Sequence, residues 1–246
     1  MYKGKIKFRV ILLAGGRGSR LGHYTNKVPK PLIKINNKEF LHYVIEFFKS
    51  SNVDKFIITT YYKSYLFRNY INKKKIKNIK QIREKNRLGT GGSFLNVLKY
   101  IDHEKNYYNI LCNADTLFLF SFKKILKKIS LKQNYILGLK KNNCKRYGRL
   151  KLKSNQIIRI ERNNKKKGYI SSGIFFFRKL NLNFFKNMNN KQLKFEEDIL
   201  NKLLKKRVKI NCLKLDAPFI DIGVPSDLKK SEKFIKKSFN EYIKKL

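Results

Sequence analysis

Residues 8–22 read FRVILLAGGRGSRLG, a largely apolar run that passes directly into a glycine-rich loop. An apolar run of this length predicts a strand that is buried on both faces, as in parallel sheets. Glycines at the carboxyl end of such a strand let backbone N–H groups approach an anion that a Cβ atom would keep away. The stretch therefore predicts an open α/β sheet with a ligand at its strand ends.

The rest of the first half alternates short apolar runs with amphipathic segments. Further strands are expected at Lys55–Thr60, Ile76–Ile82 and Asn109–Cys112. Apolar stripes with i, i+3, i+4 and i+7 spacing predict helices that contain Leu41, Phe94 and Phe122. Because strands and helices alternate in this order, right-handed crossovers and a mostly parallel sheet are expected.

The second half changes character. Four strands with little helix between them are expected at Tyr135–Lys140, Arg149–Lys153, Gln156–Glu161 and Tyr169–Phe177. Polar and apolar residues alternate along Arg149–Lys153, as in a half-exposed antiparallel strand, so a mixed sheet is expected here. Helices return at Phe195–Lys206 and from Pro225 onward. The chain shows neither a flexible linker nor a repeat, which favours a single α/β domain over residues 1–246.

The chain is strongly basic. Its 246 residues include 59 Lys and Arg against 16 Asp and Glu, a formal net charge of +43, while 42% of the residues are hydrophobic. This apolar content predicts a folded protein rather than a disordered polycation. Clustered cations can bind a nucleic-acid backbone, but here lysines occupy almost every exposed-looking segment, which is typical of compositional drift at neutral surface positions. No specific nucleic-acid partner is therefore expected.

The cysteines and the apolar runs bear on the compartment. Cys112, Cys144 and Cys212 have no C-x-x-C spacing and cannot all pair with one another, which indicates a reducing compartment. The uncharged runs are too short to span a bilayer, and the run before Gly15 is too short for the core of a signal peptide. We expect a cytoplasmic protein without membrane insertion, and the sequence leaves a homo-oligomer open.

Further blocks follow the glycine-rich loop in a recognisable order. The set is Gly15–Leu21, Pro29–Pro31, Leu88–Gly92, Asn113–Asp115, Ser172–Phe175 and Phe219–Pro225. With these blocks the chain resembles the sugar-1-phosphate nucleotidyltransferases, and most of all their branch of heptose 1-phosphate guanylyltransferases. The resemblance implies a Rossmann-like three-layer α/β fold of the nucleotide-diphospho-sugar transferase type, with a mostly parallel mixed sheet. It also implies a nucleotide-binding half, residues 1–130, and a sugar-binding half, residues 131–246.

The resemblance assigns catalysis to Arg20, Lys30 and Asp115. A sugar 1-phosphate is mostly dianionic near neutral pH and needs no strong general base, so charge neutralisation and positioning should dominate catalysis. Asp115 and Asp221 each stand beside apolar runs, and two carboxylates together with substrate phosphates suit Mg²⁺, the predicted cofactor. The alternatives are a helix cap for Asp115 and a backbone-bonded turn for Asp221.

The nucleotide is expected against the glycine-rich loop and its neighbours. The predicted contacts are Ala14, Gly15, Gly16, Gly18, Ser19, Arg20, Glu84, Gly89, Thr90 and Asn113. A carboxylate at Glu84 could accept hydrogen bonds from N1–H and the 2-amino group of guanine, an edge that uracil and thymine lack. Glu84 could equally pair at the surface with Arg83, Lys85 or Arg87, an interaction of little energetic weight.

The resemblance places the sugar against residues of the second half. These are Tyr147, Gly148, Glu161, Ser171 and Ser172. Carboxylate, hydroxyl and backbone groups can bind sugar hydroxyls in a cleft, and ordinary polar residues of half-exposed strands are the alternative. The chain departs from the heptose branch in having Ser171-Ser172-Gly173 in place of Asn-Gly-Gly. It also has Arg87 where proline is usual and Ala114 where glycine is usual.

Together these residues predict transfer of a nucleotidyl group to a sugar 1-phosphate, with release of pyrophosphate. The first expectation is GMP from GTP and D-glycero-α-D-manno-heptose 1-phosphate, giving an activated sugar for lipopolysaccharide or capsule synthesis. The second is mannose 1-phosphate or another hexose 1-phosphate with GTP, UTP or CTP. A basic nucleic-acid binder or an inactive regulatory homologue is the non-enzymatic alternative.

Overall fold

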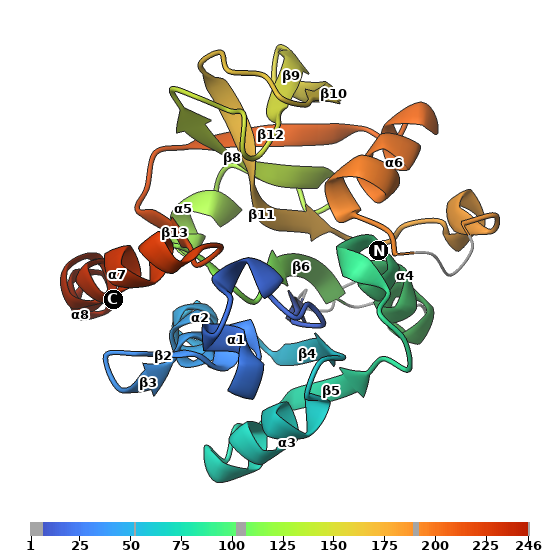
Figure 1. The fold of residues 1–246 in the computed structure, drawn as a ribbon. Coiled ribbons are helices and arrows are strands. Elements are labelled where there is room, and N and C mark those ends of the chain that lie inside the picture. The colour runs from blue at the N-terminus through green and yellow to red at the C-terminus, as the bar shows by residue number, and fades with distance from the viewer. Residues whose placement is uncertain (1–6, 52, 102–106, 189–191, 246) are drawn as a thin grey trace.

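The computed structural model describes residues 7–51, 53–101, 107–188 and 192–245, whose path is drawn in Figure 1. Nine strands of this part of the chain form one sheet in the spatial order β5-β4-β1-β6-β11-β8-β12-β10-β9. Their bounds are β1 (Lys7–Leu13), β4 (Lys55–Thr60), β5 (Ile79–Arg83), β6 (Tyr107–Asn113), β8 (Asn134–Lys141), β9 (Arg149–Lys153), β10 (Gln156–Glu161), β11 (Gly168–Phe177) and β12 (Ile210–Leu215).

The four strands of the first half pair in parallel, as their apolar runs predict. β1 lies between β4 and β6, with Val10 beside both Phe56 and Ile110, and β5 pairs with β4. The connecting helices are α2 (Phe40–Lys49), α3 (Ser64–Lys73) and α4 (Gly89–Ile101). The strand expected from Ile76 begins only at Ile79. The reason is that Lys75 and Asn78 have positive φ values, which turn the chain after α3.

Two apolar clusters lie on the two faces of this sheet. Successive residues of β1 point to opposite faces, so Val10 belongs to one cluster and Ile11 to the other. Helices α2 and α3 supply the first cluster together with the C-terminal helices α7 (Pro225–Phe234), η5 (Ile235–Phe239) and α8 (Asn240–Lys244). Helix α4 supplies the second with η4 (Phe195–Leu200) and α6 (Asn201–Lys205). The predicted three-layer α/β fold is thus confirmed.

The second half continues the same sheet with mixed strand directions. β11 runs antiparallel to both β6 and β8, and β12 runs parallel to β8. The sequence pattern misses β12 and α3, because lysine and asparagine interrupt the apolar residues of both segments. The helix expected at Phe195–Lys206 consists of one π-helical turn, η4, followed by the short α6.

Short elements complete the fold. They are η1 (Ser19–Leu21), α1 (Tyr24–Lys27), η2 (Lys30–Leu32), β2 (Lys34–Ile35), β3 (Lys38–Glu39), β7 (Thr116–Phe118), α5 (Phe122–Leu126), η3 (Leu182–Phe185) and β13 (Phe219–Asp221). β7 and β13 form a separate two-stranded antiparallel sheet. This small sheet joins the two halves of the chain.

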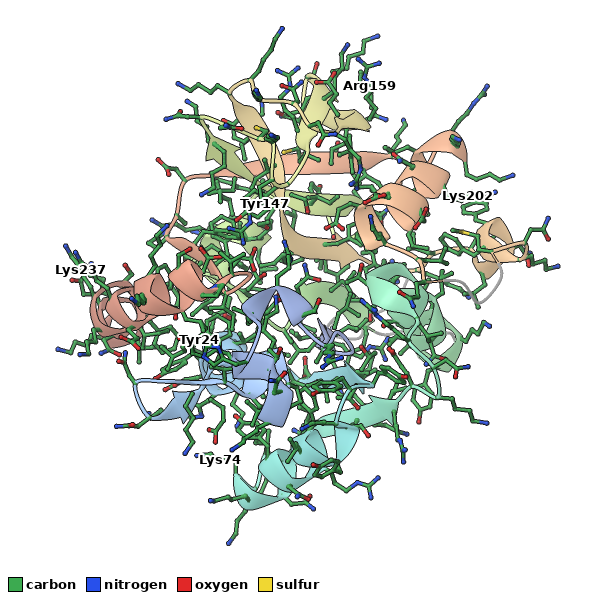
Figure 2. The ribbon with its side chains drawn as sticks, in the orientation of Figure 1. Tyr24, Lys74, Tyr147, Arg159, Lys202 and Lys237 are labelled. Atoms are coloured by element: carbon green, nitrogen blue, oxygen red, sulfur yellow. The ribbon has the colours of Figure 1, made fainter. Side chains whose placement is uncertain are left out.

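The basic side chains are spread over the molecule. In Figure 2, Lys74, Lys202 and Lys237 project at three separate edges, whereas Tyr147 lies near the centre of the view. This distribution is consistent with the expectation that most lysines result from compositional drift at neutral surface positions. Within the described residues, the helices are too short or too polar to cross a membrane. All three cysteines are buried and free.

Candidate active site

A cavity of about 710 Å³ opens where the ends of β1 and β6 face β11 and the β8–β9 connection. The predicted site residues line this cavity, with the exceptions of Glu84 and Glu161. The cavity therefore brings together residues that lie more than two hundred positions apart in the sequence, such as Ala14 and Asp221.

The glycine-rich loop packs directly on the side chain of Lys30. Gly18 has a φ of +74°, and a Cβ atom there would lie 3.0 Å from the Cβ of Lys30 and 3.3 Å from the Cγ2 of Thr25. Glycine is required both by the backbone conformation and by the space. Lys30 begins η2 directly after Pro29 and is 9% exposed. The loop and the lysine thus form one unit, which explains why the two motifs occur together in the sequence.

Lys30 is the counterion of Asp115. Its ammonium forms an ion pair with the Asp115 carboxylate, which also accepts a hydrogen bond of 3.3 Å from the Thr116 hydroxyl. Burial is the largest single influence and would raise the pKa of Asp115, but the charge of Lys30 and the hydrogen bonds to the carboxylate together outweigh it, and the pKa lies below its usual value. Asp115 is therefore ionised at neutral pH.

The small sheet of β7 and β13 brings Asp221 beside Asp115. Thr116 lies opposite Asp221 in the register, and the backbone N–H of Ile222 donates to the carbonyl of Asp115 at 3.1 Å. Burial, and next the charge of Asp115, raise the pKa of Asp221 to about 6. The guanidinium of Arg146 lies 3.1 Å from the Asp221 carboxylate. Two adjacent carboxylates, each with its own cation, thus form one corner of the cavity.

The Leu88–Gly92 block holds another segment of its own chain. Gly89 has a φ of +70°, and a Cβ atom there would overlap the carbonyl of Leu193. The N–H of Gly91 donates to that same carbonyl at 2.8 Å, and the Thr90 hydroxyl accepts from the N–H of Phe195 at 2.9 Å. The block therefore fixes the start of η4 at the edge of the cavity, besides lining the cavity itself.

Cations outnumber carboxylates on the cavity wall. The lining Lys and Arg residues are Arg17, Arg20, Lys30, Arg87, Lys145, Arg146, Arg162 and Lys194. The lining carboxylates are Asp115, Glu196, Glu197 and Asp221. In the part of the chain that the structure describes, Arg17, Arg20, Arg87 and Lys145 have no carboxylate partner. Unpaired cations in a concave site favour a ligand with several negative charges.

Several of these lining residues were missed by sequence reasoning. Arg146 and Arg162 directly adjoin the predicted Tyr147 and Glu161, so this adjacency was the available signal. Arg162 pairs with Glu197, which also lies 2.8 Å from the ammonium of Lys194. Neighbouring Glu196 has its pKa raised by burial. Two adjacent acids in so basic a chain are an unusual feature that could have been noticed.

Glu84 lies behind the glycine-rich loop rather than on the cavity wall. It is 3% exposed, which is inconsistent with the alternative of a surface ion pair. A Cβ atom on Gly15 would lie 2.8 Å from its Oε2, so the carboxylate touches the back of the loop. Burial raises its pKa, although the hydroxyls of Ser93 and Thr59 act to lower it. Its Oε1 has no hydrogen-bond partner among the described residues.

Glu161 also lies off the cavity wall. Its carboxylate accepts hydrogen bonds from Arg149 Nε at 2.9 Å, Arg159 Nη2 at 2.9 Å and Asn164 Nδ2 at 3.0 Å. The two arginines keep the pKa of Glu161 below its usual value. Ser172 lines the cavity, and its buried hydroxyl has no partner within the described residues.

Comparison with known proteins places this cavity in an enzyme family. Residues 9–238 match the nucleotidyl transferase family, so the chain belongs to that family. The predicted enzyme class, nucleotidyltransferase, is confirmed. A D-glycero-alpha-D-manno-heptose 1-phosphate guanylyltransferase of Aneurinibacillus thermoaerophilus is 32% identical over 236 residues, which cover 91% of this chain and 96% of the relative. A protein of the same description from Campylobacter jejuni is 32% identical over 224 residues, with coverages of 89% and 96%.

A solved structure shows the same fold over nearly the whole chain. HddC from Yersinia pseudotuberculosis, crystallised with GMP-PN, superposes with a TM-score of 0.76 at 27% identity. The match covers 92% of this chain and 98% of HddC. The nucleotidyltransferase fold therefore includes both walls of the cavity.

Proposed function

We propose that the protein transfers GMP from GTP to a sugar 1-phosphate, with D-glycero-α-D-manno-heptose 1-phosphate as the first candidate. The substrates named for the relatives from Aneurinibacillus and Campylobacter support both choices, and the guanine nucleotide in the HddC complex supports the choice of GTP. The predicted halves, residues 1–130 for the nucleotide and 131–246 for the sugar, belong to the same proposal. Free cysteines and nucleotide substrates are consistent with a cytoplasmic enzyme.

The unbalanced charge of the cavity wall carries this proposal. The reaction must bring together two polyanions, a nucleoside triphosphate and a sugar phosphate, which repel each other in water. Arg17, Arg20, Arg87 and Lys145 present positive charge without a carboxylate partner among the described residues. These cations offset the repulsion before any bond changes, which is the main requirement for phosphoryl-type transfer.

The reaction needs little proton transfer. A phosphate oxygen of the sugar 1-phosphate attacks the α-phosphorus of GTP, and a new P–O bond forms. The bond between the α-phosphorus and the oxygen bridging to the β-phosphorus breaks, and pyrophosphate leaves with the electron pair. Arg20 would hold the leaving pyrophosphate, and Lys30 would lie between the nucleotide and the sugar phosphate. Tyr147, Gly148, Ser171 and Ser172 would bind sugar hydroxyls on the opposite wall.

Asp115 and Asp221 are the residues that would hold Mg²⁺. The donor set fits a hard cation that takes two carboxylates and completes its shell with phosphate and water. Across the described residues no group of three or more His, Cys, Asp or Glu side chains could hold a metal without such help. When bound, Mg²⁺ would neutralise phosphate charge at the transferred group.

The experiment measures pyrophosphate release from GTP, UTP, CTP and dTTP with heptose, mannose and glucose 1-phosphates, with and without Mg²⁺. We expect GTP and the heptose phosphate to give the highest kcat/KM. Arg20→Gln should lower the rate about 100-fold through lost transition-state stabilisation. The matched control is Arg68→Gln, which removes the same charge from exposed α3, off the cavity wall. Absence of release with every pair of substrates would show that the proposed function is wrong.

A further inference from the structure

Arg146 connects two parts of the wall that the proposed function assigns to the sugar, here called the sugar-side wall, which is lined by residues 145–148, 171–173 and Phe219. Its Nη2 atom lies 3.1 Å from Asp221 Oδ2 and 2.9 Å from Asp227 Oδ2. A Cβ atom on Gly223 would overlap this nitrogen, so the guanidinium lies directly over the backbone between the two aspartates. Asp227 is 6% exposed and also accepts a hydrogen bond of 3.2 Å from the N–H of Val224 at the start of α7. The guanidinium is therefore fixed from several sides.

The loop that carries Arg146 also carries predicted sugar-binding residues. The N–H groups of Tyr147 and Gly148 both donate to the carbonyl of Cys144, at 3.1 Å and 2.9 Å, which forms a tight turn. The Tyr147 ring lies edge-on to Phe219 of β13, with centroids 6.3 Å apart, and Arg146 Cζ lies 5.1 Å from the centroid of the Tyr147 ring. Two contacts therefore hold this turn: the ion pairs of Arg146 connect it to β13 and α7, and the ring of Tyr147 contacts Phe219.

We propose that Arg146 is a positioning residue: it locks the turn of residues 144–148 onto β13 and α7 and thereby fixes Tyr147 relative to Asp221. The inference rests on the proposed function, in which Tyr147 contacts the sugar and Asp221 lies at the reacting phosphates. Asp227 holds Arg146 in this position. It lies outside the cavity lining and accepts a hydrogen bond from the Arg146 guanidinium.

A substitution of Asp227 can distinguish a positioning role of Arg146 from direct binding of the phosphate by Arg146. Asp227→Asn keeps the guanidinium and keeps an oxygen that can accept from the N–H of Val224, but it removes the charge that holds Arg146. A positioning role predicts weaker sugar-phosphate binding in this variant. If Arg146 instead bound the phosphate directly, its release from Asp227 would leave that affinity unchanged or improve it.

The first measurement is amide hydrogen exchange of the full chain without substrates. We expect residues 144–148 to exchange about tenfold faster in Asp227→Asn and in Arg146→Gln, with β1 and β6 unchanged. The double variant should exchange no faster than Arg146→Gln alone, because both changes break the same contact. Arg68→Gln is the control for loss of one positive charge. Unchanged exchange in Asp227→Asn overturns the inference.

The second measurement divides the kinetic effect between the substrates. In Asp227→Asn, KM for the heptose 1-phosphate should rise about tenfold, while KM for GTP stays within about twofold. Arg146→Lys, which keeps the positive charge on a side chain one atom shorter, should give an intermediate value. An equal rise of both KM values overturns the inference. If the wild type releases no pyrophosphate with any substrate, the proposed function fails, and the exchange experiment still decides whether the lock exists.

Discussion

The two walls of the cavity are built in different ways. One wall, which we propose faces the nucleotide and call the nucleotide-side wall, consists of loops at the ends of parallel strands, where Gly15–Ser19 and Gly89–Thr90 expose backbone. The sugar-side wall consists of side chains that antiparallel strands and ion pairs bring together, such as Tyr147 with Phe219 and Arg146 with Asp221. The first wall depends on local conformation, and the second depends on contacts between distant segments. The two walls should therefore respond differently to substitution.

The largest effect is expected at Lys30, which belongs to the corner where the walls meet. Lys30→Ala should lower kcat/KM for pyrophosphate release about 1,000-fold, because a cation at the reacting phosphates is lost and Asp115 loses its counterion. Both substrates should be affected, unlike in Asp227→Asn. Lys27→Ala is the matched control, since Lys27 is exposed on α1 and does not line the cavity.

A loss in Lys30→Ala of less than about tenfold would contradict this reading of the corner. Thermal unfolding must be measured beside the rate, because Asp115 becomes a partly buried carboxylate without a counterion in the variant. If the variant is folded and slow, the loss belongs to the chemistry. If it is unfolded, Lys30→Arg keeps the charge and provides the second test.

The sequence predicts the nucleotide-side wall well because its signals are local. The apolar run of β1, the loop that follows it and the helical stripe of α4 can each be recognised within about 20 residues. The pairing of β12 with β8 cannot be recognised in this way, because it places Ile210 beside Asn134 and these two residues are far apart in the sequence. Fold class is therefore predictable, whereas the strand order of the second half is not.

The same distinction holds for the site. Asp115 and Asp221 could be proposed as a pair from the resemblance, and the register of β7 with β13 puts them side by side. Arg146, in contrast, is one of 59 Lys and Arg residues, and although it adjoins the predicted Tyr147, its role becomes visible only through its two aspartate partners. Glu161 was predicted at the sugar, but Arg149 and Arg159 occupy its carboxylate. The distribution of charged residues along the sequence does not predict which of them form ion pairs in the folded protein.

The next effect concerns the contact between the glycine block and η4. Gly89→Ala should destabilise the protein by about 2–4 kcal/mol, because its φ of +70° is unfavourable for alanine and the new Cβ overlaps the Leu193 carbonyl. Urea unfolding measures the change. Gly16→Ala is the matched control, since no atom lies within 4 Å of the added Cβ. It should change stability by less than about 0.5 kcal/mol.

This pair of alanines also tests how local the nucleotide-side wall is. If Gly89→Ala were as stable as Gly16→Ala, residues 192–195 would move without cost, and the block would serve the ligand alone. If both variants lost the same stability, the loop after β1 would also be held by packing that the open space around Gly16 does not show. If Gly89→Ala is less stable than Gly16→Ala, as predicted, the loop after β1 serves mainly the ligand, whereas the Leu88–Gly92 block also holds residues 192–195 in place.

The smallest effect is expected at Glu84, which supports the nucleotide-side wall from behind. Glu84→Gln should stabilise the protein by about 1–2 kcal/mol at pH 7.5, because it removes a buried charge that has one unpartnered oxygen. Burial raises the pKa of Glu84, so the native state binds the proton more tightly than the unfolded chain. Wild-type stability should therefore fall as pH rises above the usual glutamate range, and the gap to the variant should close on acidification.

Urea unfolding between pH 4.5 and 8 measures this gap, with Glu241→Gln on exposed α8 as the control for loss of one acid. A variant that is less stable than the wild type at pH 7.5 would mean that the carboxylate makes favourable contacts with the glycine-rich loop. The ratio of kcat/KM for GTP to that for UTP, measured on the same proteins, tests the predicted guanine contact. A stabilised variant with an unchanged ratio assigns Glu84 to the loop alone. A ratio that falls about tenfold means that the carboxylate reaches the base, so this wall recognises its ligand through a side chain as well as through its backbone.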